Sequence, residues 1–473
     1  MGAVLTVLSE IKAGQAKLEA AVEDLRAVAR APFTSPAHLA HDVLETLGKI
    51  TGGIVDFVGD GAPFLSLEEA AVVAALKPES ALVKHMTPLL WDARGLGDYR
   101  AAGADVCPLL LINSEKYAWL DDASIPLLPQ FLLKPDLFAS WAPFFESRGS
   151  DADATADFRL LYGVLADRSL QLDGGVCELY AAKLQVNNAA FGELCNYHRL
   201  RGKGLCRGML LGSDAFWLYE SHCGNPLKLI KSTWVSPGSL ALVRSFFGAP
   251  TEPPLVTLLR DLLSTLHVRV RVGVSFLGAG GSGRVFAVTR GGRAFALKAS
   301  VGVSQSALID EFSKLSRAFY LGAPVVSVVS SSLHFFSTGG GYLMDGLCVQ
   351  FVPTSKRRVT AAFAALAALH AKDVFHGDAR VQNLLVREDE QLVWADFMCA
   401  SIGHLCPKIT LAEKDALALA SSILGHATDL LPDHVRVAAK SYADSGGVTR
   451  LELINAVASC KFGSGGDNQG QLP

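Results

Sequence analysis

The chain has 473 residues, of which 50% are hydrophobic and 19% are charged, and its formal net charge is −3. A chain of this length exceeds what one hydrophobic core usually organises, so we expect two or three domains. The composition excludes a disordered protein, and the slightly negative charge excludes a surface that is strongly basic throughout.

Neither a membrane segment nor a targeting signal is expected. No stretch reaches the roughly 20 apolar residues that a membrane-spanning helix needs. A secretory signal has a basic residue before its apolar stretch, but none precedes the apolar start of this chain, Met1 to Leu8. The nine cysteines form no CxxC pair, which argues against a zinc site and a disulfide framework. We therefore expect an intracellular protein, cytoplasmic or nuclear, without a membrane partner.

The N-terminal region, residues 1–120, is predicted to be mainly helical. Apolar residues recur at three- and four-residue steps from Val4 to Val28, and Glu68 to Ala75 is predicted to form a further helix. The first helix could be a partner-binding arm, but its pattern covers fewer than four heptads, which favours a packed helix. Leu109 to Ile112 is predicted to be a buried strand.

The central region, residues 121–248, has a mixed helix and strand pattern. A helix that carries Leu194 precedes two strands, Cys206 to Gly212 and Ala215 to Glu220. Because only two residues separate these strands, they are predicted to form a β-hairpin.

Two segments are predicted to flank a C-terminal domain at residues 263–462. Three prolines between Pro250 and Pro254 make 249–262 the best candidate for a linker. The glycine-rich tail, residues 463–473, is expected to be disordered.

A glycine-rich run lies near the start of the C-terminal domain. Gly278 to Gly283 has the sequence Gly-Ala-Gly-Gly-Ser-Gly, a spacing that dinucleotide-binding folds share. In those folds a helix begins inside the motif. Here a strand pattern follows, Arg284 to Thr289, and then a turn and a second strand, Ala294 to Lys298. No GKS or GKT follows, so a Walker-type loop is excluded, and the pattern predicts a phosphate-covering glycine loop between strands.

Lys298 ends the last of these strands, where it is placed to reach back to the phosphates. Its expected partner is an acidic residue on the next helix. Glu311 is the candidate and Asp310 the competitor, and a solvated position on the helix surface is the alternative for either.

The strongest pattern begins at His376, with the sequence His-Gly-Asp-Ala-Arg-Val-Gln-Asn. Phosphoryl transfer needs one carboxylate to orient the attacking hydroxyl, and a second carboxylate with an amide oxygen to bind magnesium. Asp378 and Asn383 are five residues apart, and Asn383 and Asp396 are thirteen apart. A hairpin predicted between Asn383 and Asp396 would bring those two side chains together.

These motifs, in this order, resemble those of the protein-kinase superfamily. The resemblance implies a bilobal kinase-like domain that binds ATP and Mg²⁺ and phosphorylates serine or threonine hydroxyls of a protein substrate. It also implies that Asp415, on a following helix, anchors the catalytic loop. The resemblance assigns phosphate covering to Gly278, Gly280 and Gly283, nucleotide contacts to Val285 and Ala296, phosphate pairing to Lys298 and Glu311, catalysis to Asp378, Lys298 and Arg380, and magnesium binding to Asn383 and Asp396.

Three departures from the family pattern carry information. Gly377 replaces the arginine that usually receives an activation-loop phosphate, and Met398 replaces the glycine after Asp-Phe. Only eighteen residues separate Asp396 from Asp415, without an Ala-Pro-Glu motif, so a small-molecule substrate is an alternative to a protein. The His-Gly-Asp-Ala-Arg and Trp-x-Asp-Phe sequences are similar to those of kinase-like domains in crinkler-type proteins.

Crinkler-type proteins often carry a restriction-endonuclease-like domain, which residues 121–248 resemble in part. Lys134 to Phe138 is similar to the metal-binding turn of the PD-(D/E)xK nuclease fold, and Lys183 occupies the position of its lysine. Ala181 replaces the carboxylate expected two residues before the lysine, and Glu193 on the next helix could substitute. We predict a degenerate α/β nuclease-like domain that could still contact nucleic acid.

The sequence therefore predicts an α+β multidomain protein with N-terminal helices, a central α/β nuclease-like domain and a C-terminal kinase-like domain. The predicted function is that of an ATP-dependent protein kinase. Two alternatives stay open: a pseudokinase that binds nucleotide as a signalling scaffold, and a nuclease or nucleic-acid-binding protein with a regulatory kinase domain.

Overall fold

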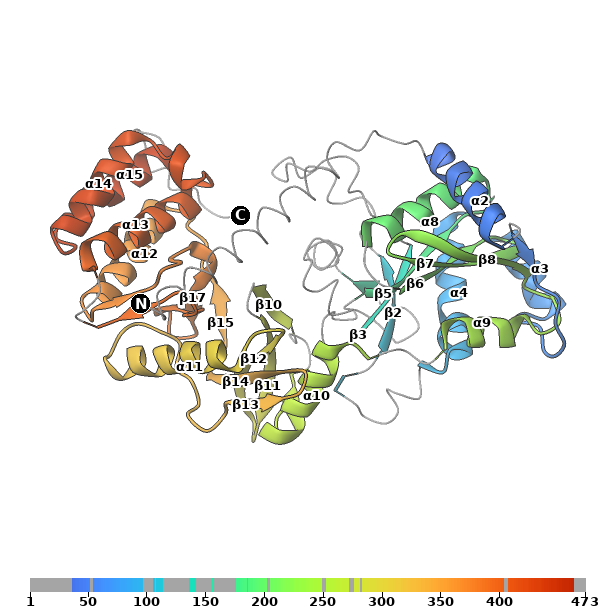
Figure 1. Ribbon diagram of the computed structural model, residues 1–473, viewed down its shortest axis with the longest axis horizontal. Helices are drawn as coiled ribbons and strands as arrows, with labels where there is room; N and C mark the ends of the chain where they lie inside the picture. Colours follow the sequence, from blue (N-terminus) through green and yellow to red (C-terminus); the bar gives the residue numbers. More distant parts are fainter. Residues whose placement is uncertain are drawn as a thin grey trace. The chain divides into compact units, whose positions relative to one another are not determined.

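The structure is a computed structural model (Figure 1). Its helices and several sheets confirm the predicted α+β class. It divides into two compact units: unit 1 is Met1–Trp141 with Ser147–Thr251, and unit 2 is Ala142–Glu146 with Glu252–Pro473. The residues described are 36–51, 54–96, 105–106, 108–113, 136–141, 155–156, 176–184, 186–201, 205–248, 252–271, 276–280, 283–403 and 407–462. The predicted helix from Val4 to Val28, residues 134–135 and the tail 463–473 lie outside them.

Unit 1 is built around an eight-stranded mixed sheet with the strand order β1-β8-β7-β6-β5-β3-β2-β4. The pairs β1–β8, β5–β6 and β2–β4 are parallel, and the others are antiparallel. The strands are β1 Val55–Asp56, β2 Pro108–Asn113, β3 Leu137–Trp141, β4 Thr155–Ala156, β5 Val176–Ala182, β6 Leu205–Leu211, β7 Ala215–His222 and β8 Asn225–Thr233.

Helices cover both faces of this sheet (Figure 1). Helices α2 and α8 pack together on one face, and α4 lies on the other face, where α9 contacts it. This two-sided cover explains why the inner strands β6 and β7 are buried along nearly their whole length. The helices are α2 Pro36–Thr51, α3 Leu67–Ala75, α4 Glu79–Ala93, α8 Asn188–Arg201 and α9 Ser239–Phe247.

Three local predictions for unit 1 that fall on described residues are confirmed. The strand at Leu109 is β2, the helix at Glu68 is α3, and β6 and β7 form the predicted hairpin. The structure differs from the predicted boundary between residues 120 and 121. Strands β1 and β2, which precede that boundary, pair with β8 and β3, which follow it, so the sheet of unit 1 crosses the predicted boundary.

Unit 2 begins with a six-stranded sheet, in which β10, β11, β12, β14 and β13 follow one another and β9 also pairs with β11. These pairs are all antiparallel, and β11 and β12 are the strands predicted at Arg284 to Thr289 and at Ala294 to Lys298. The strands are β9 Arg269–Val270, β10 Phe276–Gly280, β11 Gly283–Arg290, β12 Arg293–Val301, β13 His334–Phe336 and β14 Gly339–Asp345.

The two units divide at Thr251 and Glu252, inside the predicted linker 249–262, but most of that range is the helix α10, Pro254–Leu266. Pro254 occupies the first turn, where proline lacks only an amide that has no helical partner. The helix packs against β12 and β14 with its leucines buried. A Cβ at Gly341 on β14 would lie 2.6 Å from a Leu262 methyl group, so glycine allows this close approach.

The rest of unit 2 is mainly helical, with two small sheets, β15-β17-β18 and β16-β19. One hydrophobic core runs from Ala296 on β12 through the helices to Val457 on α15, so the large sheet and the helices share a core. None of the helices in the described part of the chain combines the length and hydrophobicity needed to cross a bilayer. The elements are α11 Gln305–Tyr320, β15 Cys348–Gln350, α12 Lys356–His370, β16 Val374–Phe375, η3 Val381–Asn383, β17 Leu384–Arg387, β18 Leu392–Trp394, β19 Ser401–Ile402, α13 Lys408–Leu424, η4 Thr428–Leu430, α14 Asp433–Asp444 and α15 Arg450–Phe462.

Candidate functional site

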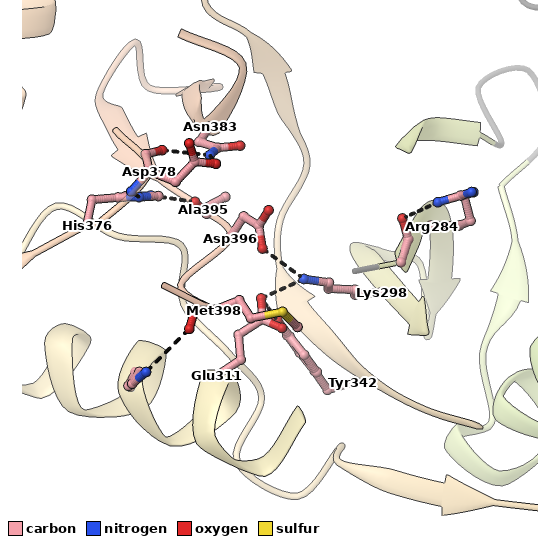
Figure 2. A network of polar contacts seen from close by, with 12 residues as sticks. Arg284, Lys298, Glu311, Tyr342, His376, Asp378, Asn383, Ala395, Asp396 and Met398 are labelled. Carbon is pink, nitrogen blue, oxygen red and sulfur yellow. Dashed lines mark hydrogen bonds and ion pairs between the residues drawn. The ribbon is translucent and has the colours of Figure 1, made fainter. Parts of the chain in front are cut away.

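A buried ion pair joins the large sheet of unit 2 to helix α11 (Figure 2). Lys298 Nζ on β12 lies 2.6 Å from Glu311 Oε1, and both side chains are almost completely buried. Asp310, the competing candidate, lies on the surface and pairs with Lys314 instead. The structure therefore brings Lys298 together with the acidic residue that the sequence favoured.

Asp396 is the second carboxylate near this lysine. Its Oδ1 lies 3.3 Å from Lys298 Nζ, so the ammonium group is shared between two acidic residues (Figure 2). The backbone of Asp396 is in the left-handed region, with φ of 61°. Aspartate tolerates this conformation better than most residues, because its short polar side chain can bond locally.

The loop around Asp378 forms a separate hydrogen-bond network. Arg380 donates a hydrogen bond of 2.6 Å to Asp378 Oδ2, and Asn383 Nδ2 donates to the same oxygen at 3.1 Å. Asn383 Nδ2 also donates to the Asp378 carbonyl oxygen at 2.9 Å. Both of these hydrogen bonds use the amide nitrogen of Asn383, so its amide oxygen takes no part in the contact with Asp378.

The hairpin of β17 and β18 determines how Asn383 and Asp396 lie. Leu384 pairs with Trp394, and the Ala395 N–H donates to the Asn383 carbonyl oxygen at 2.9 Å. Asp396 follows directly, so the backbone register places both predicted magnesium-binding residues at the same end of the hairpin, as expected from their spacing.

The backbone of the loop at His376 and Gly377 is held by Asp415, which is completely buried on α13. Its Oδ2 accepts a hydrogen bond from the His376 N–H at 2.7 Å, and its Oδ1 accepts one from the Gly377 N–H at 2.8 Å. His370 also lies 3.1 Å from Oδ2. A buried carboxylate is costly unless several donors satisfy it, so this set holds the loop rigidly to the helix.

His376 is a buried structural hydrogen-bonding residue in this loop. Its Nε2 lies 2.8 Å from the Ala395 carbonyl oxygen and donates to it, while Nδ1 accepts from the Asp378 N–H at 3.3 Å. Burial lowers the pKa of His376, although the Ala395 carbonyl and the nearby carboxylates oppose this. The neutral ring with one donor and one acceptor suits both contacts.

This histidine predicts a pH dependence of stability. In the unfolded chain a histidine has a pKa near 6.5, and the folded pKa is lower. As the pH falls below about 6.5 the unfolded state therefore binds more protons, and the free energy of unfolding decreases. We expect urea unfolding at pH 7.5 and 5.5 to show a smaller pH effect in His376→Gln than in the wild type. An equal effect would contradict this role, and exposed His426→Gln is the control.

The glycines of the predicted phosphate loop differ in their surroundings. Gly280 pairs with Gly283 across the turn between β10 and β11. A Cβ at Gly283 would lie 2.5 Å from Ser300 Oγ, so β11 approaches β12 too closely there for a larger residue. Among the described residues, no atom lies within 4 Å of the Cβ position of Gly278.

Val285 and Ala296 lie on the same sheet as the lysine. Val285 is half-buried on β11 directly opposite Lys298, and Ala296 lies two residues before that lysine, opposite Met344 on β14. All the candidate residues of unit 2 thus lie within the described structure, on β10–β12, on α11, in the loop around Asp378 and next to the β17–β18 hairpin.

One residue of this network was not predicted from the sequence. Tyr342 on β14 is completely buried, and its hydroxyl donates to Glu311 Oε1 at 3.1 Å. No local motif marks this tyrosine. Its position opposite Lys298 on the neighbouring strand follows only from the pairing of β12 with β14.

In unit 1, Lys183 is surrounded by carboxylates from distant parts of the chain. Its Nζ lies 3.1 Å from Glu193 and 3.5 Å from Glu79, which is in the first turn of α4 and was not predicted. Burial lowers the pKa of Lys183, but the charges of Glu193, Asp136 and Glu79 outweigh burial and raise it.

The other predicted residues near Lys183 offer few ligands for a metal ion. Asp136 is buried, and its Oδ2 accepts a hydrogen bond from the Ala182 N–H at 2.9 Å. Ala181 is completely buried and supplies no ligand. Within the described residues of the whole chain, no group of three or more His, Cys, Asp or Glu residues is placed to hold a metal ion.

Comparison with known proteins adds no identification. No protein-family model matches the chain, and the search of curated proteins gives no match either.

Proposed function

We propose that unit 2 is an ATP-dependent phosphotransferase of the protein-kinase type, which phosphorylates serine or threonine hydroxyls. The observation that carries this proposal is the network in which Lys298 contacts both Glu311 and Asp396. These three residues come from β12, α11 and the segment after β18, and only the fold brings them together. The resemblance of the motifs to the protein-kinase superfamily points in the same direction.

The residues present fit magnesium and a nucleotide. Magnesium prefers oxygen ligands and is usually held by one or two carboxylates, with water and substrate phosphates completing its shell. Asp396 and the Asn383 amide oxygen are donors of this kind, at the same end of the β17–β18 hairpin. The Lys298 ammonium, which lies between two carboxylates, suits phosphate oxygens. When bound, magnesium would neutralise charge on the phosphates.

The chain's own residues would then have distinct roles. Asp378 would accept the proton of the attacking hydroxyl, since it is the partly exposed carboxylate of the catalytic loop. Asn383 and Arg380 donate to Asp378 Oδ2 and so fix the direction of that carboxylate. Asp415 keeps the loop backbone in place, and Lys298 is held where a phosphate can replace one of its carboxylate partners.

The acceptor class follows from the short segment after Asp396. Helix α13 begins at Lys408, and the intervening residues Ser401 and Ile402 pair with β16. Such a segment offers a small platform for an extended peptide, so a small hydroxyl compound is the second candidate acceptor. The carboxylates around Lys183 in unit 1 favour a second activity less clearly than the Lys298 network favours phosphoryl transfer. We therefore propose that unit 1 is a degenerate nuclease-like domain.

The test is γ-phosphate transfer by the purified full chain with magnesium-ATP, using autophosphorylation and mixed Ser/Thr peptides as acceptors. We expect phosphate incorporation that EDTA abolishes. EDTA removes magnesium, and without it the negative charges of the nucleotide phosphates and of the site carboxylates would repel each other. Binding of ATP without transfer would favour the nucleotide-binding scaffold. If the chain neither binds ATP nor transfers phosphate, the proposal is refuted.

A further inference from the structure

Tyr342 lies next to Glu311 in the network around Lys298 (Figure 2). It lies on β14 directly opposite Lys298 on β12. Its hydroxyl donates to Glu311 Oε1 at 3.1 Å, and Lys298 Nζ approaches the same oxygen to 2.6 Å. The tyrosine and the lysine therefore both hold one carboxylate oxygen.

Glu311 needs this second donor because it is completely buried. Its other oxygen, Oε2, has no hydrogen-bond partner within the described part of the chain. Lys298 is also only partly committed to Glu311, since Asp396 lies 3.3 Å from the same ammonium group. A buried carboxylate that loses its donors is strongly destabilised. When Lys298 turns towards another anion, the Tyr342 hydroxyl is the donor that stays on Glu311.

The tyrosine is itself held firmly in this orientation. Its ring packs edge-on against Phe312, the residue after Glu311 on α11, with centroids 5.4 Å apart. Burial, and then the charge of Glu311, raise the pKa of Tyr342 well above its usual value. The hydroxyl therefore keeps its proton and acts as a donor at all physiological pH values.

We propose that Tyr342 is a positioning residue, whose hydroxyl fixes the Glu311 carboxylate so that Lys298 is presented to the nucleotide phosphates. This inference rests on the proposed phosphotransferase function of unit 2. It assigns to β14 a part in the site that the sequence motifs do not include.

The experiment compares the wild-type full chain with Tyr342→Phe and with 4-aminophenylalanine at position 342. Phenylalanine keeps the ring packing but removes the donor, whereas the aminophenyl group restores a donor at the same place. A hydrogen bond to a charged group is strong enough for its loss to weaken magnesium-ATP binding by about tenfold. We expect this loss in Tyr342→Phe, measured by calorimetry, and recovery of most of the affinity with 4-aminophenylalanine. The turnover rate should follow the same order.

The control is Tyr219→Phe, which removes a buried tyrosine hydroxyl from unit 1 and should leave nucleotide affinity unchanged. Wild-type affinity in Tyr342→Phe would overturn the inference, as would an aminophenyl variant no better than phenylalanine. Both outcomes require a wild type that binds magnesium-ATP, so they are distinct from failure of the proposed function. A wild type that binds no nucleotide would overturn both proposals together.

Discussion

Asp396→Asn is expected to reduce phosphoryl transfer by about 10²-fold or more while the protein stays folded. Asparagine has the same shape and also tolerates the left-handed backbone conformation at this position, where φ is 61°. What it loses is the negative charge that faces Lys298 at 3.3 Å and that would bind magnesium. The effect should therefore be larger on the magnesium dependence of the reaction than on thermal stability.

The measurement is the initial rate of γ-phosphate transfer over a magnesium titration, together with the thermal unfolding midpoint. Asp389→Asn is a matched control, because Asp389 is an exposed carboxylate in the same β17–β18 hairpin and pairs only loosely with Arg387. The control should retain the wild-type rate. Equal rates for Asp396→Asn and the wild type would show that this carboxylate has no role in metal binding.

The parts of the site that the sequence predicts are those fixed by short-range geometry. The residues between Asn383 and Asp396 form a single hairpin. Its two strands pair with Leu384 opposite Trp394, which places Asn383 and Asp396 at the same end. In the same way, two alternating strands and a tight turn place Lys298 opposite Val285. Strand and turn propensities act over a few residues, so the sequence pattern is sufficient there.

The parts that the sequence does not predict depend on contacts between distant segments. Tyr342 reaches Glu311 only because β14 is the neighbour of β12, and Glu79 reaches Lys183 only because α4 packs on the sheet of unit 1. The prolines between Pro250 and Pro254 mark the border between the two units, but they do not predict the helix that begins at Pro254. In each case the local sequence allows more than one structure, and packing against distant segments determines which one forms.

Gly377→Ala is expected to lower the free energy of unfolding of unit 2 by about 2 to 4 kcal/mol and to reduce phosphoryl transfer strongly. Gly377 has φ of 77°, in the region that other residues rarely adopt, and a Cβ there would collide with the Cys399 carbonyl oxygen. Its N–H also donates to Asp415 at 2.8 Å. A side chain at position 377 must therefore push the catalytic loop away from α13 or displace the segment after Asp396.

Gly291→Ala separates these two causes. Gly291 also has a positive φ, 57°, in the turn between β11 and β12, but nothing lies within 4 Å of its Cβ position. It should lose about 1 kcal/mol from backbone strain alone, as measured by urea unfolding, and retain transfer activity. If the two variants were equally stable, the contact with Cys399 would contribute nothing. If Gly377→Ala has the lower free energy of unfolding, the close approach of the Cys399 carbonyl oxygen to Gly377 accounts for the difference, and this packing holds the loop against the segment after Asp396.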